Sequence, residues 1–107
     1  MPRLFRMPGE IVQPYPYNLA FTFTTTADIA QDAATLTTRM SEGNKVSIIV
    51  ENNDAYIDFD RNATTASMLI PAGSGYFDDG IAIETRISII NATAGNNARI
   101  RGIVWGR

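Results

Sequence analysis

From residue 19 onwards the chain alternates short apolar runs with clusters of turn-forming residues. Segment 19–24 reads LAFTFT, with a large apolar side chain at every second position, which is the period of a half-buried β-strand. Segment 55–60 reads AYIDFD, so that Ile57 and Phe59 share one face while acidic side chains lie on the other. Both segments are predicted to be strands.

Four later segments are also predicted to be strands. Their apolar residues are separated by loops rich in Gly, Asn, Asp and Pro, which interrupt strands and allow turns. The run at 87–90, apolar except for Ser88, predicts a strand that is buried on both sides. The four segments are residues 67–70, 81–84, 87–90 and 98–105.

Two further predictions concern the region between residues 27 and 51. Segments 35–40 and 45–51 are extended runs separated by the polar cluster 41–44, whose length is suited to closing a β-hairpin. Segment 27–36 is rich in alanine, and Asp28 near its start is able to open a helix. One or two helical turns are expected there at most, because so short a helix is marginal.

The whole pattern predicts an all-β fold. About seven or eight short strands without a long helix are typical of an antiparallel β-sandwich or jelly roll. A chain of 107 residues is long enough for one hydrophobic core and too short for two self-supporting ones. We therefore expect an extended N-terminal arm, residues 1–17, followed by a single β-sandwich domain, residues 18–107.

The predicted arm is extended and unusually apolar. Prolines at positions 2, 8, 14 and 16 fix φ, remove backbone donors and favour extended geometry. Its apolar and aromatic side chains exceed those of a typical solvated tail. The arm is expected either to pack along its own domain or to dock on a neighbouring subunit, with disorder as a third alternative. Its interface candidates are Arg3, Leu4, Phe5, Arg6, Ile11, Tyr15 and Tyr17.

Composition and charge narrow the function classes. The chain has no cysteine and no histidine, which removes disulfides, thiolate and imidazole metal ligands, and Ser-His-Asp catalysis. A net charge of −2 gives no general attraction to nucleic acid. No apolar run reaches the ~18 residues that cross a bilayer, and the N-terminus lacks a secretion signal. We expect a soluble product made in the cytoplasm, without a nucleic-acid or membrane partner.

Pairs of carboxylates are the remaining candidates for catalysis. Asp58 and Asp60 lie two residues apart on a predicted strand, would point to the same face, and could act as the acid and base of a glycosidase-like site. A solvated face explains this pair better, and a turn before Gly80 explains Asp78 and Asp79. Calcium would suit such loops, but the spacing of an EF-hand is absent. The expectation is a non-enzymatic protein without catalytic residues, cofactor or metal site.

The last predicted strand carries another candidate surface. Arg99, Arg101 and Trp105 fall on one side of it, because alternate residues of a strand share a face. Arg and Trp are enriched at subunit interfaces. These three residues are therefore interface candidates, with ordinary surface arginines beside a core tryptophan as the alternative.

Three segments in the second half of the chain resemble small structural proteins of tailed-bacteriophage virions. They are residues 68–76 (MLIPAGSGY), 86–91 (RISIIN) and 98–106 (ARIRGIVWG). The resemblance is to small jelly-roll capsid decoration, or cement, proteins. It includes no catalytic motif, and its segments lie within the second half of the chain.

This resemblance implies a function and a location. A cement protein binds between subunits of the major capsid protein on the capsid surface of the virion, as a homodimer or homotrimer, and stabilises the shell. Tail-fibre, head-completion and carbohydrate-binding adhesin modules of virions use comparable β-folds and remain alternatives. An adhesin would need an exposed aromatic platform formed from Tyr15, Tyr17, Tyr56, Tyr76 or Trp105.

Overall fold

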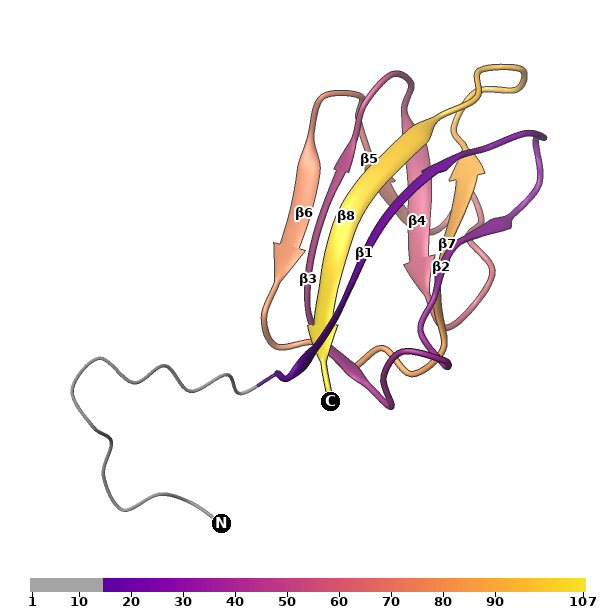
Figure 1. Ribbon diagram of the computed structural model, residues 1–107. Coiled ribbons are helices and arrows are strands. Elements are labelled where there is room, and N and C mark those ends of the chain that lie inside the picture. Colours follow the sequence, from indigo (N-terminus) through magenta and orange to yellow (C-terminus); the bar gives the residue numbers. More distant parts are fainter. Residues whose placement is uncertain (1–14) are drawn as a thin grey trace, which may run out of the picture.

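The computed structural model describes residues 15–107, which form eight β-strands and, within that range, no helix (Figure 1). The strands make two four-stranded sheets, so the predicted all-β sandwich is confirmed. Residues 1–14 of the predicted arm lie outside the described residues. The strands are β1 (Tyr17–Thr24), β2 (Gln31–Thr35), β3 (Gly43–Val50), β4 (Ala55–Phe59), β5 (Met68–Ile70), β6 (Gly75–Asp78), β7 (Arg86–Asn91) and β8 (Arg99–Gly106).

Both sheets are antiparallel throughout. Sheet A has the strand order β1-β8-β3-β6, and sheet B has the order β2-β7-β4-β5. Figure 1 shows β1 and β8 of sheet A in front of β4 and β7 of sheet B. Strands β4 and β5 are consecutive in the chain and adjacent in one sheet, whereas every other connection passes from one sheet to the other. Strands that follow one another in the sequence therefore seldom pair.

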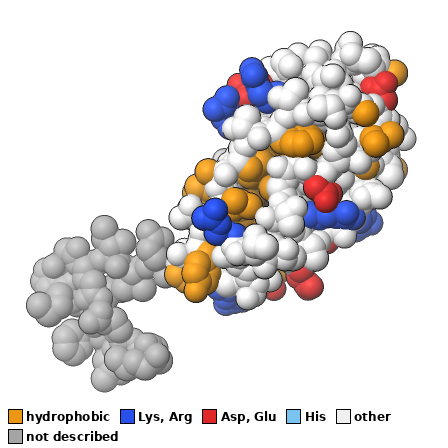
Figure 2. Space-filling model, turned by 45° about the vertical axis from the view of Figure 1, so that its right-hand side comes forward, with side chains coloured by type: hydrophobic (Ala, Val, Ile, Leu, Met, Phe, Trp, Pro, Cys, Tyr) orange, Lys and Arg blue, Asp and Glu red, His pale blue; other side chains and the backbone are white. Residues whose placement is uncertain are grey.

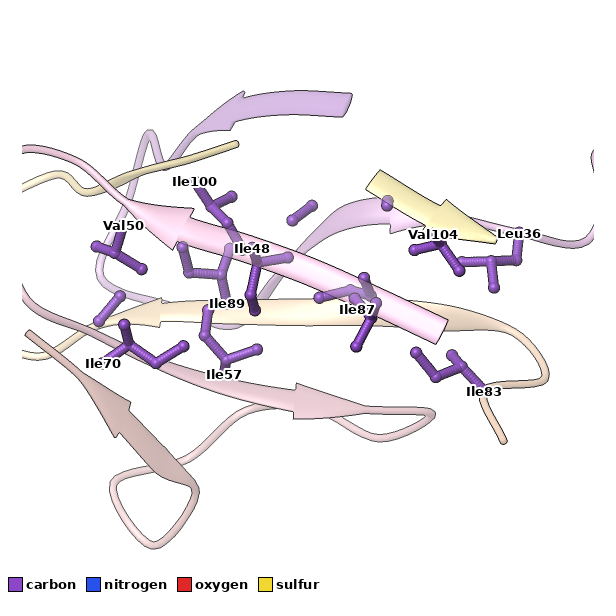
Figure 3. Close-up of a cluster of buried hydrophobic side chains, with 14 of the residues drawn as sticks. Leu36, Ile48, Val50, Ile57, Ile70, Ile83, Ile87, Ile89, Ile100 and Val104 are labelled. Carbon is purple, nitrogen blue, oxygen red and sulfur yellow. The ribbon is translucent and has the colours of Figure 1, made fainter. Parts of the chain in front are cut away.

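Branched aliphatic side chains fill the space between the sheets (Figure 3). Sheet A contributes alternate residues of its central strands, β3 and β8, and sheet B contributes those of β4 and β7. Each buried side chain of this size stabilises the fold by about 1.5–3 kcal/mol. The central members, none more than 4% exposed, are Val46, Ile48, Val50, Ile57, Ile87, Ile89, Ile100 and Val104.

Strand β7 is buried on both faces in its middle, as its run of residues that is apolar except for Ser88 predicts. Ile87, Ser88 and Ile89 have no exposed surface. The loop that carries Ala63 lies over the outer side, where the Ala63 amide donates to the Ser88 hydroxyl over 2.9 Å. The one polar side chain among these three is therefore hydrogen-bonded, as a buried hydroxyl needs to be.

The alanine-rich segment 27–36 is not helical, so that prediction is wrong. It contains β2, in which Ala33 and Ala34 are buried. Strand β2 pairs with β7, with a register shift between Asp32 and Ala34. Ladder hydrogen bonds and burial outweigh the helix preference of alanine, which is less than about 1 kcal/mol per residue.

The hairpin predicted between residues 35–40 and 45–51 is also wrong. Strand β2 lies in sheet B and β3 lies in sheet A, so they do not pair. The intervening chain makes a turn in which the amides of Arg39 and Met40 both donate to the carbonyl of Leu36. Leu36 and Met40 are buried in the core. Their apolar character reflects a buried turn and not a strand.

Residues 81–84 differ from prediction as well. Ile83 makes one isolated bridge with Gly43 and has no exposed surface, but no strand forms around it. The apolar alternation there belongs to a loop whose central side chain enters the core. The strands predicted at 67–70 and 98–105 are confirmed as β5 and β8.

Candidate interaction surface

The outer face of sheet A is formed by side chains that point away from the core. Residues directly opposite each other in antiparallel strands point to the same side, so the register sorts this face into rows. From one end to the other the rows are Lys45, Trp105 and Asn18; Phe77, Ser47, Ile103 and Ala20; Gly75, Ile49, Arg101 and Thr22; and last Glu51, Arg99 and Thr24.

Lys45 lies between two aromatic rings on this face. Its ammonium nitrogen is 4.8 Å from the centroid of the Trp105 ring and 5.6 Å from that of the Phe77 ring. Both distances fall within the range of cation–π attraction, which contributes about 0.5–1 kcal/mol at exposed sites. Phe77, Lys45 and Trp105 are named the aromatic–lysine cluster below.

Two large apolar side chains on this face, one of them a member of the cluster, are open to solvent. Phe77 is 58% exposed and Ile49 is 42% exposed. Figure 2 shows one side of the molecule, on which exposed hydrophobic side chains are interspersed with basic and acidic groups. The outer face of sheet A thus combines exposed apolar side chains, Phe77 and Ile49, with the basic side chains of Lys45, Arg99 and Arg101.

Arg99 and Arg101 project from the same side of β8 and share one acidic partner. Their Nε atoms lie 3.3 Å and 3.0 Å from Oε1 of Glu51. The hydrogen bond from Arg101, helped by both positive charges, lowers the pKa of the Glu51 carboxyl below its ordinary value. One carboxylate between two guanidinium groups leaves this end of the face with excess positive charge.

The predicted interface residues divide into three groups. Arg99, Arg101 and Trp105 lie on one face, in the rows described above. Tyr15 is half-buried just before β1, and Tyr17 begins β1 with 52% of its surface exposed. The remaining candidates lie outside the described residues; they are Arg3, Leu4, Phe5, Arg6 and Ile11.

Sequence reasoning missed three members of this face, Lys45, Ile49 and Phe77. No strand was predicted at 75–78, where β6 places Phe77 opposite Ser47. Lys45 meets Trp105 through the pairing of β3 with β8, which join distant parts of the chain. The alternation of Lys45 and Ser47 with buried valine and isoleucine in β3 was the available sign of an outward-facing row.

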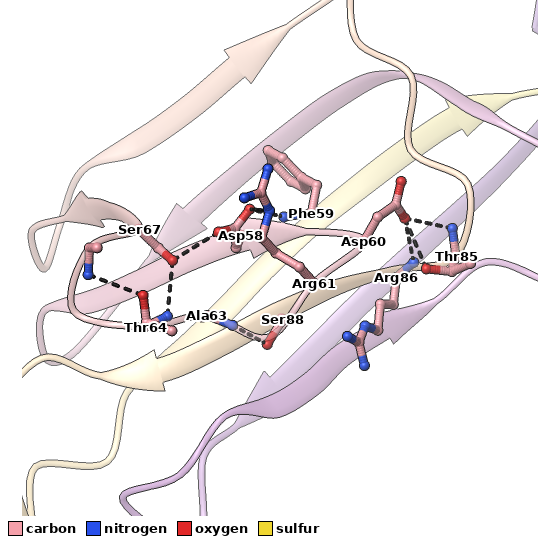
Figure 4. A network of polar contacts seen from close by, with 11 residues as sticks. Asp58, Phe59, Asp60, Arg61, Ala63, Thr64, Ser67, Thr85, Arg86 and Ser88 are labelled. Carbon is pink, nitrogen blue, oxygen red and sulfur yellow. Dashed lines mark hydrogen bonds and ion pairs between the residues drawn. The ribbon is translucent and has the colours of Figure 1, made fainter.

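Asp58 and Asp60 belong to two separate polar networks (Figure 4). Asp58 accepts hydrogen bonds from the Ser67 hydroxyl at 2.9 Å and the Phe59 amide at 2.8 Å, and it pairs with Arg61 at 3.4 Å. These contacts close the loop between β4 and β5. Strand β4 ends before Asp60, whose φ is +62°, so Asp60 does not continue the alternation expected to put both acids on one face.

Asp60 instead fixes the start of β7. Its carboxylate accepts the backbone amides of Glu84, Thr85 and Arg86 at 2.7–3.2 Å, together with the Thr85 hydroxyl. Partial burial acts to raise the pKa of the Asp60 carboxyl, but these hydrogen bonds prevail and hold it below its ordinary value. A general acid needs the opposite shift, so Asp60 does not meet that role of a glycosidase-like pair.

Asp78 ends β6 and begins the predicted turn. Its carboxylate accepts the Tyr76 hydroxyl at 2.7 Å and the Gly80 amide at 2.8 Å. Across residues 15–107 no group of three or more acidic side chains is gathered closely enough to hold a metal ion, and no pocket is found. The same part of the chain contains no helix that is long and apolar enough to cross a membrane.

Comparison with known proteins adds no relative to this picture. No protein-family model, no curated protein and no solved structure matches the chain.

Proposed function

We propose that this chain is a non-catalytic structural module that decorates the capsid of a tailed-phage virion and docks on the major capsid protein through the outer face of sheet A. The observation that carries the docking surface is the aromatic–lysine cluster with its exposed Phe77. Aromatic side chains and arginine are the residues enriched where protein interfaces are fully buried. The virion part of the proposal rests on the resemblance of segments 68–76, 86–91 and 98–106 to cement proteins.

The strand order supports the jelly-roll part of this proposal. Eight strands in two antiparallel sheets, with six of the seven connections crossing between the sheets, match a double-sheet jelly roll. Viral capsid domains use this architecture, and so do lectins. The fold alone therefore favours either a capsid role or a glycan-binding role.

The aromatic–lysine cluster favours protein docking over glycan binding. A sugar would stack on a free ring face, but the Lys45 ammonium lies over both Phe77 and Trp105. Displacing it would forfeit the cation–π attraction. Tyr76 is half-buried and donates its hydroxyl to Asp78, so it does not extend an exposed platform.

The charges on the outer face of sheet A indicate the chemistry of the partner. Lys45 lies at one end, and Arg99 and Arg101 outnumber Glu51 at the other. An apolar patch bordered by acidic side chains on the capsid subunits would complement this arrangement. Electrostatic complementarity of this kind raises the association rate and makes binding sensitive to salt.

Co-sedimentation with undecorated capsid shells tests the proposal. The wild-type protein should pellet with the shells, and Phe77→Ser should weaken binding about tenfold or more, as expected for a central interface residue. Leu69→Ser is the matched control, because Leu69 is 48% exposed on β5 of sheet B.

Three results would reject all or part of the proposal. Failure of the wild-type protein to bind shells would remove the capsid role, and density confined to the tail in cryo-electron microscopy of virions would favour the fibre or head-completion alternative. Equal losses for Phe77→Ser and Leu69→Ser would reject the outer face of sheet A as the docking surface.

A further inference from the structure

Strand β1 forms one edge of sheet A, and half of its backbone groups point away from that sheet. The Thr25 amide donates to the Ala98 carbonyl over 2.9 Å, in the same register that pairs β1 with β8. Hydrogen-bonding direction alternates along an antiparallel strand, so the odd-numbered residues of β1 bond to β8. The even-numbered ones direct their N–H and C=O groups outwards; they are Asn18, Ala20, Thr22 and Thr24, and all are exposed.

The other three sheet edges carry features that discourage pairing. Strand β2 has a register shift beside Asp32, β5 has three residues, and β6 has four residues and ends at Asp78. Short length, bulges and charges are the usual protection of edge strands. Strand β1 has none of these: it has eight residues, pairs with β8 without a register shift, and carries no charge.

We propose that β1 pairs antiparallel with β1 of a second copy of this chain, about a two-fold axis at Phe21. This inference concerns the free protein and does not depend on capsid binding. A two-fold dimer requires a surface that complements itself, and an uncharged strand presents no like charges to its own copy. The long stretch without charge, residues 11–27, extends beyond β1 at both ends.

The backbone geometry selects this register. Outward-pointing residues must face one another to exchange hydrogen bonds, so Ala20 lies opposite Thr22 of the second copy, and Asn18 lies opposite Thr24. The pairing uses all four outward-pointing residues of each strand and makes about eight inter-strand hydrogen bonds. Phe21 then faces its own counterpart on the two-fold axis.

The side chains agree with the same register. Leu19, Phe21 and Phe23 face inwards against the core but are only partly buried, because β1 is an edge. In the dimer Leu19 lies beside Phe23 of the second copy. The inward-facing apolar side chains of the two β1 strands therefore form one continuous surface across the junction. On the outer side the row of Ala20, Thr22 and their counterparts is small and uncharged, which allows close approach.

The dimer would join two copies of sheet A into one continuous eight-stranded sheet. The two outer faces would then lie side by side and present two aromatic–lysine clusters in one fixed geometry. Two linked docking faces bind a repeating lattice more tightly than one, because the second contact becomes intramolecular.

Molar mass measured by light scattering or sedimentation tests the pairing. The wild-type protein should be dimeric at high concentration and dissociate on dilution. Thr22→Lys should be a folded monomer, because charges on an edge strand oppose pairing and the two new lysines would lie about 7–8 Å apart. Thr35→Lys makes the same change at an exposed position on the β2 edge and should leave the dimer intact.

Disulfide trapping tests the register, because the chain has no cysteine of its own. Phe21→Cys should form a covalent dimer on mild oxidation, since directly opposed residues without hydrogen bonds have Cα atoms about 4.5 Å apart. Phe23→Cys is the matched control: its counterpart would lie about 13 Å away, so no cross-link is expected.

Several outcomes would overturn the inference. A monomeric wild-type protein at high concentration would do so, as would a dimer that survives Thr22→Lys. Cross-linking of Phe23→Cys as readily as Phe21→Cys would reject the two-fold axis at Phe21. If Phe21→Cys does not fold, the comparison of Thr22→Lys with Thr35→Lys still decides whether β1 is the interface. Loss of shell binding without loss of the dimer would reject the proposed function alone.

Discussion

Lys45 and Trp105 lie directly opposite each other on β3 and β8, with the lysine ammonium 4.8 Å from the centroid of the indole ring. Trp105 is the single tryptophan of the chain, so tryptophan fluorescence reports on the surroundings of this one ring. Lys45→Met keeps a long side chain but removes the charge from the ring faces. It should change the Trp105 emission and lower the free energy of unfolding by about 0.5–1 kcal/mol.

The matched control for this prediction is Arg101→Met. It removes a positive charge from the same face of sheet A, at a position that forms an ion pair with Glu51 and does not contact Trp105. Its emission spectrum should match that of the wild-type protein. Identical spectra for Lys45→Met and the wild-type protein would show that the ammonium does not lie over the indole in solution.

Three replacements of Asp60 should distinguish the stability that its carboxylate contributes by hydrogen bonding from the stability that depends on its positive φ. Asp60→Asn tolerates the φ of +62° but loses the negative charge that holds three amides, and we expect a loss of about 1–2 kcal/mol. Asp60→Ala should cost about 1 kcal/mol more than Asp60→Gly, because both lose the acceptor but alanine is strained at positive φ.

Urea denaturation measures these differences, and hydrogen exchange locates them. Exchange should accelerate at the amides of Glu84, Thr85 and Arg86 in all three variants. Stabilities that are equal for the alanine and glycine variants would contradict the role assigned to the backbone conformation. Unchanged exchange at the three amides would contradict the role of the carboxylate.

Acid should destabilise this protein through its carboxylates. Each affected group has a folded-state pKa below its ordinary value of about 3.9–4.3, so its contribution is complete above that value and is lost as the pH falls through the folded-state pKa. The free energy of unfolding should therefore fall below about pH 4.5. The groups are Asp28, Glu42, Glu51, Asp60 and Asp78.

Unfolding measured at a series of pH values checks this prediction. Asp60→Asn should show a shallower acid limb than the wild-type protein, because it lacks one of these titrations. The chain has no histidine, so little change is expected between about pH 6 and 8. A stability that rises on acidification below pH 4.5 would contradict the lowered pKa values.

The fold class was predictable because it depends on local patterns. Period-two alternation identifies β1 and β4, and a run that is apolar except for Ser88 identifies the doubly buried β7. Turn residues between these runs were sufficient to reject a helical or parallel architecture. These features are encoded within windows of about six residues.

The pairing of strands was not predictable, because it depends on distant segments. Ala33 and Ala34 carry no local strand signal, yet the core buries both of them and Ala34 pairs with Ile87 of β7. The predicted hairpin failed for the same reason, since sequence neighbours here lie in opposite sheets. The aromatic–lysine cluster needs three strands in register, so a single candidate, Trp105, was found from the sequence.

Gly106 should tolerate no side chain, in contrast to Gly73. A Cβ at Gly106 would overlap the backbone carbonyl of Glu42 and the sulfur of Met40, where β8 closes against the start of β3. Gly106→Ala should cost about 3 kcal/mol, at the upper end for overpacking. Gly73→Ala meets open space and should cost about 1–2 kcal/mol from its φ of +83°. Equal thermal stabilities of the two variants would contradict this contrast.

Thr25, which directly follows β1, should contribute more to stability than Thr24, the last residue of that strand. Thr25 is 1% exposed; its hydroxyl donates to the Asn91 side chain and accepts the Ala98 amide. Thr25→Val keeps the shape but leaves the Ala98 amide with a single longer bond, to Asn91 at 3.2 Å. We expect a loss of about 1–3 kcal/mol.

Thr24→Val is the control for this last comparison, because Thr24 is exposed and valine suits a strand. Its free energy of unfolding should stay within about 0.5 kcal/mol of the wild-type value. Because Asn91 also binds Asp28 and Asn97, Thr25→Val should loosen the loop between β7 and β8, visible as faster exchange of the Gly95 amide. Equal stability of the two variants would mean that this network does not hold the end of the sandwich together.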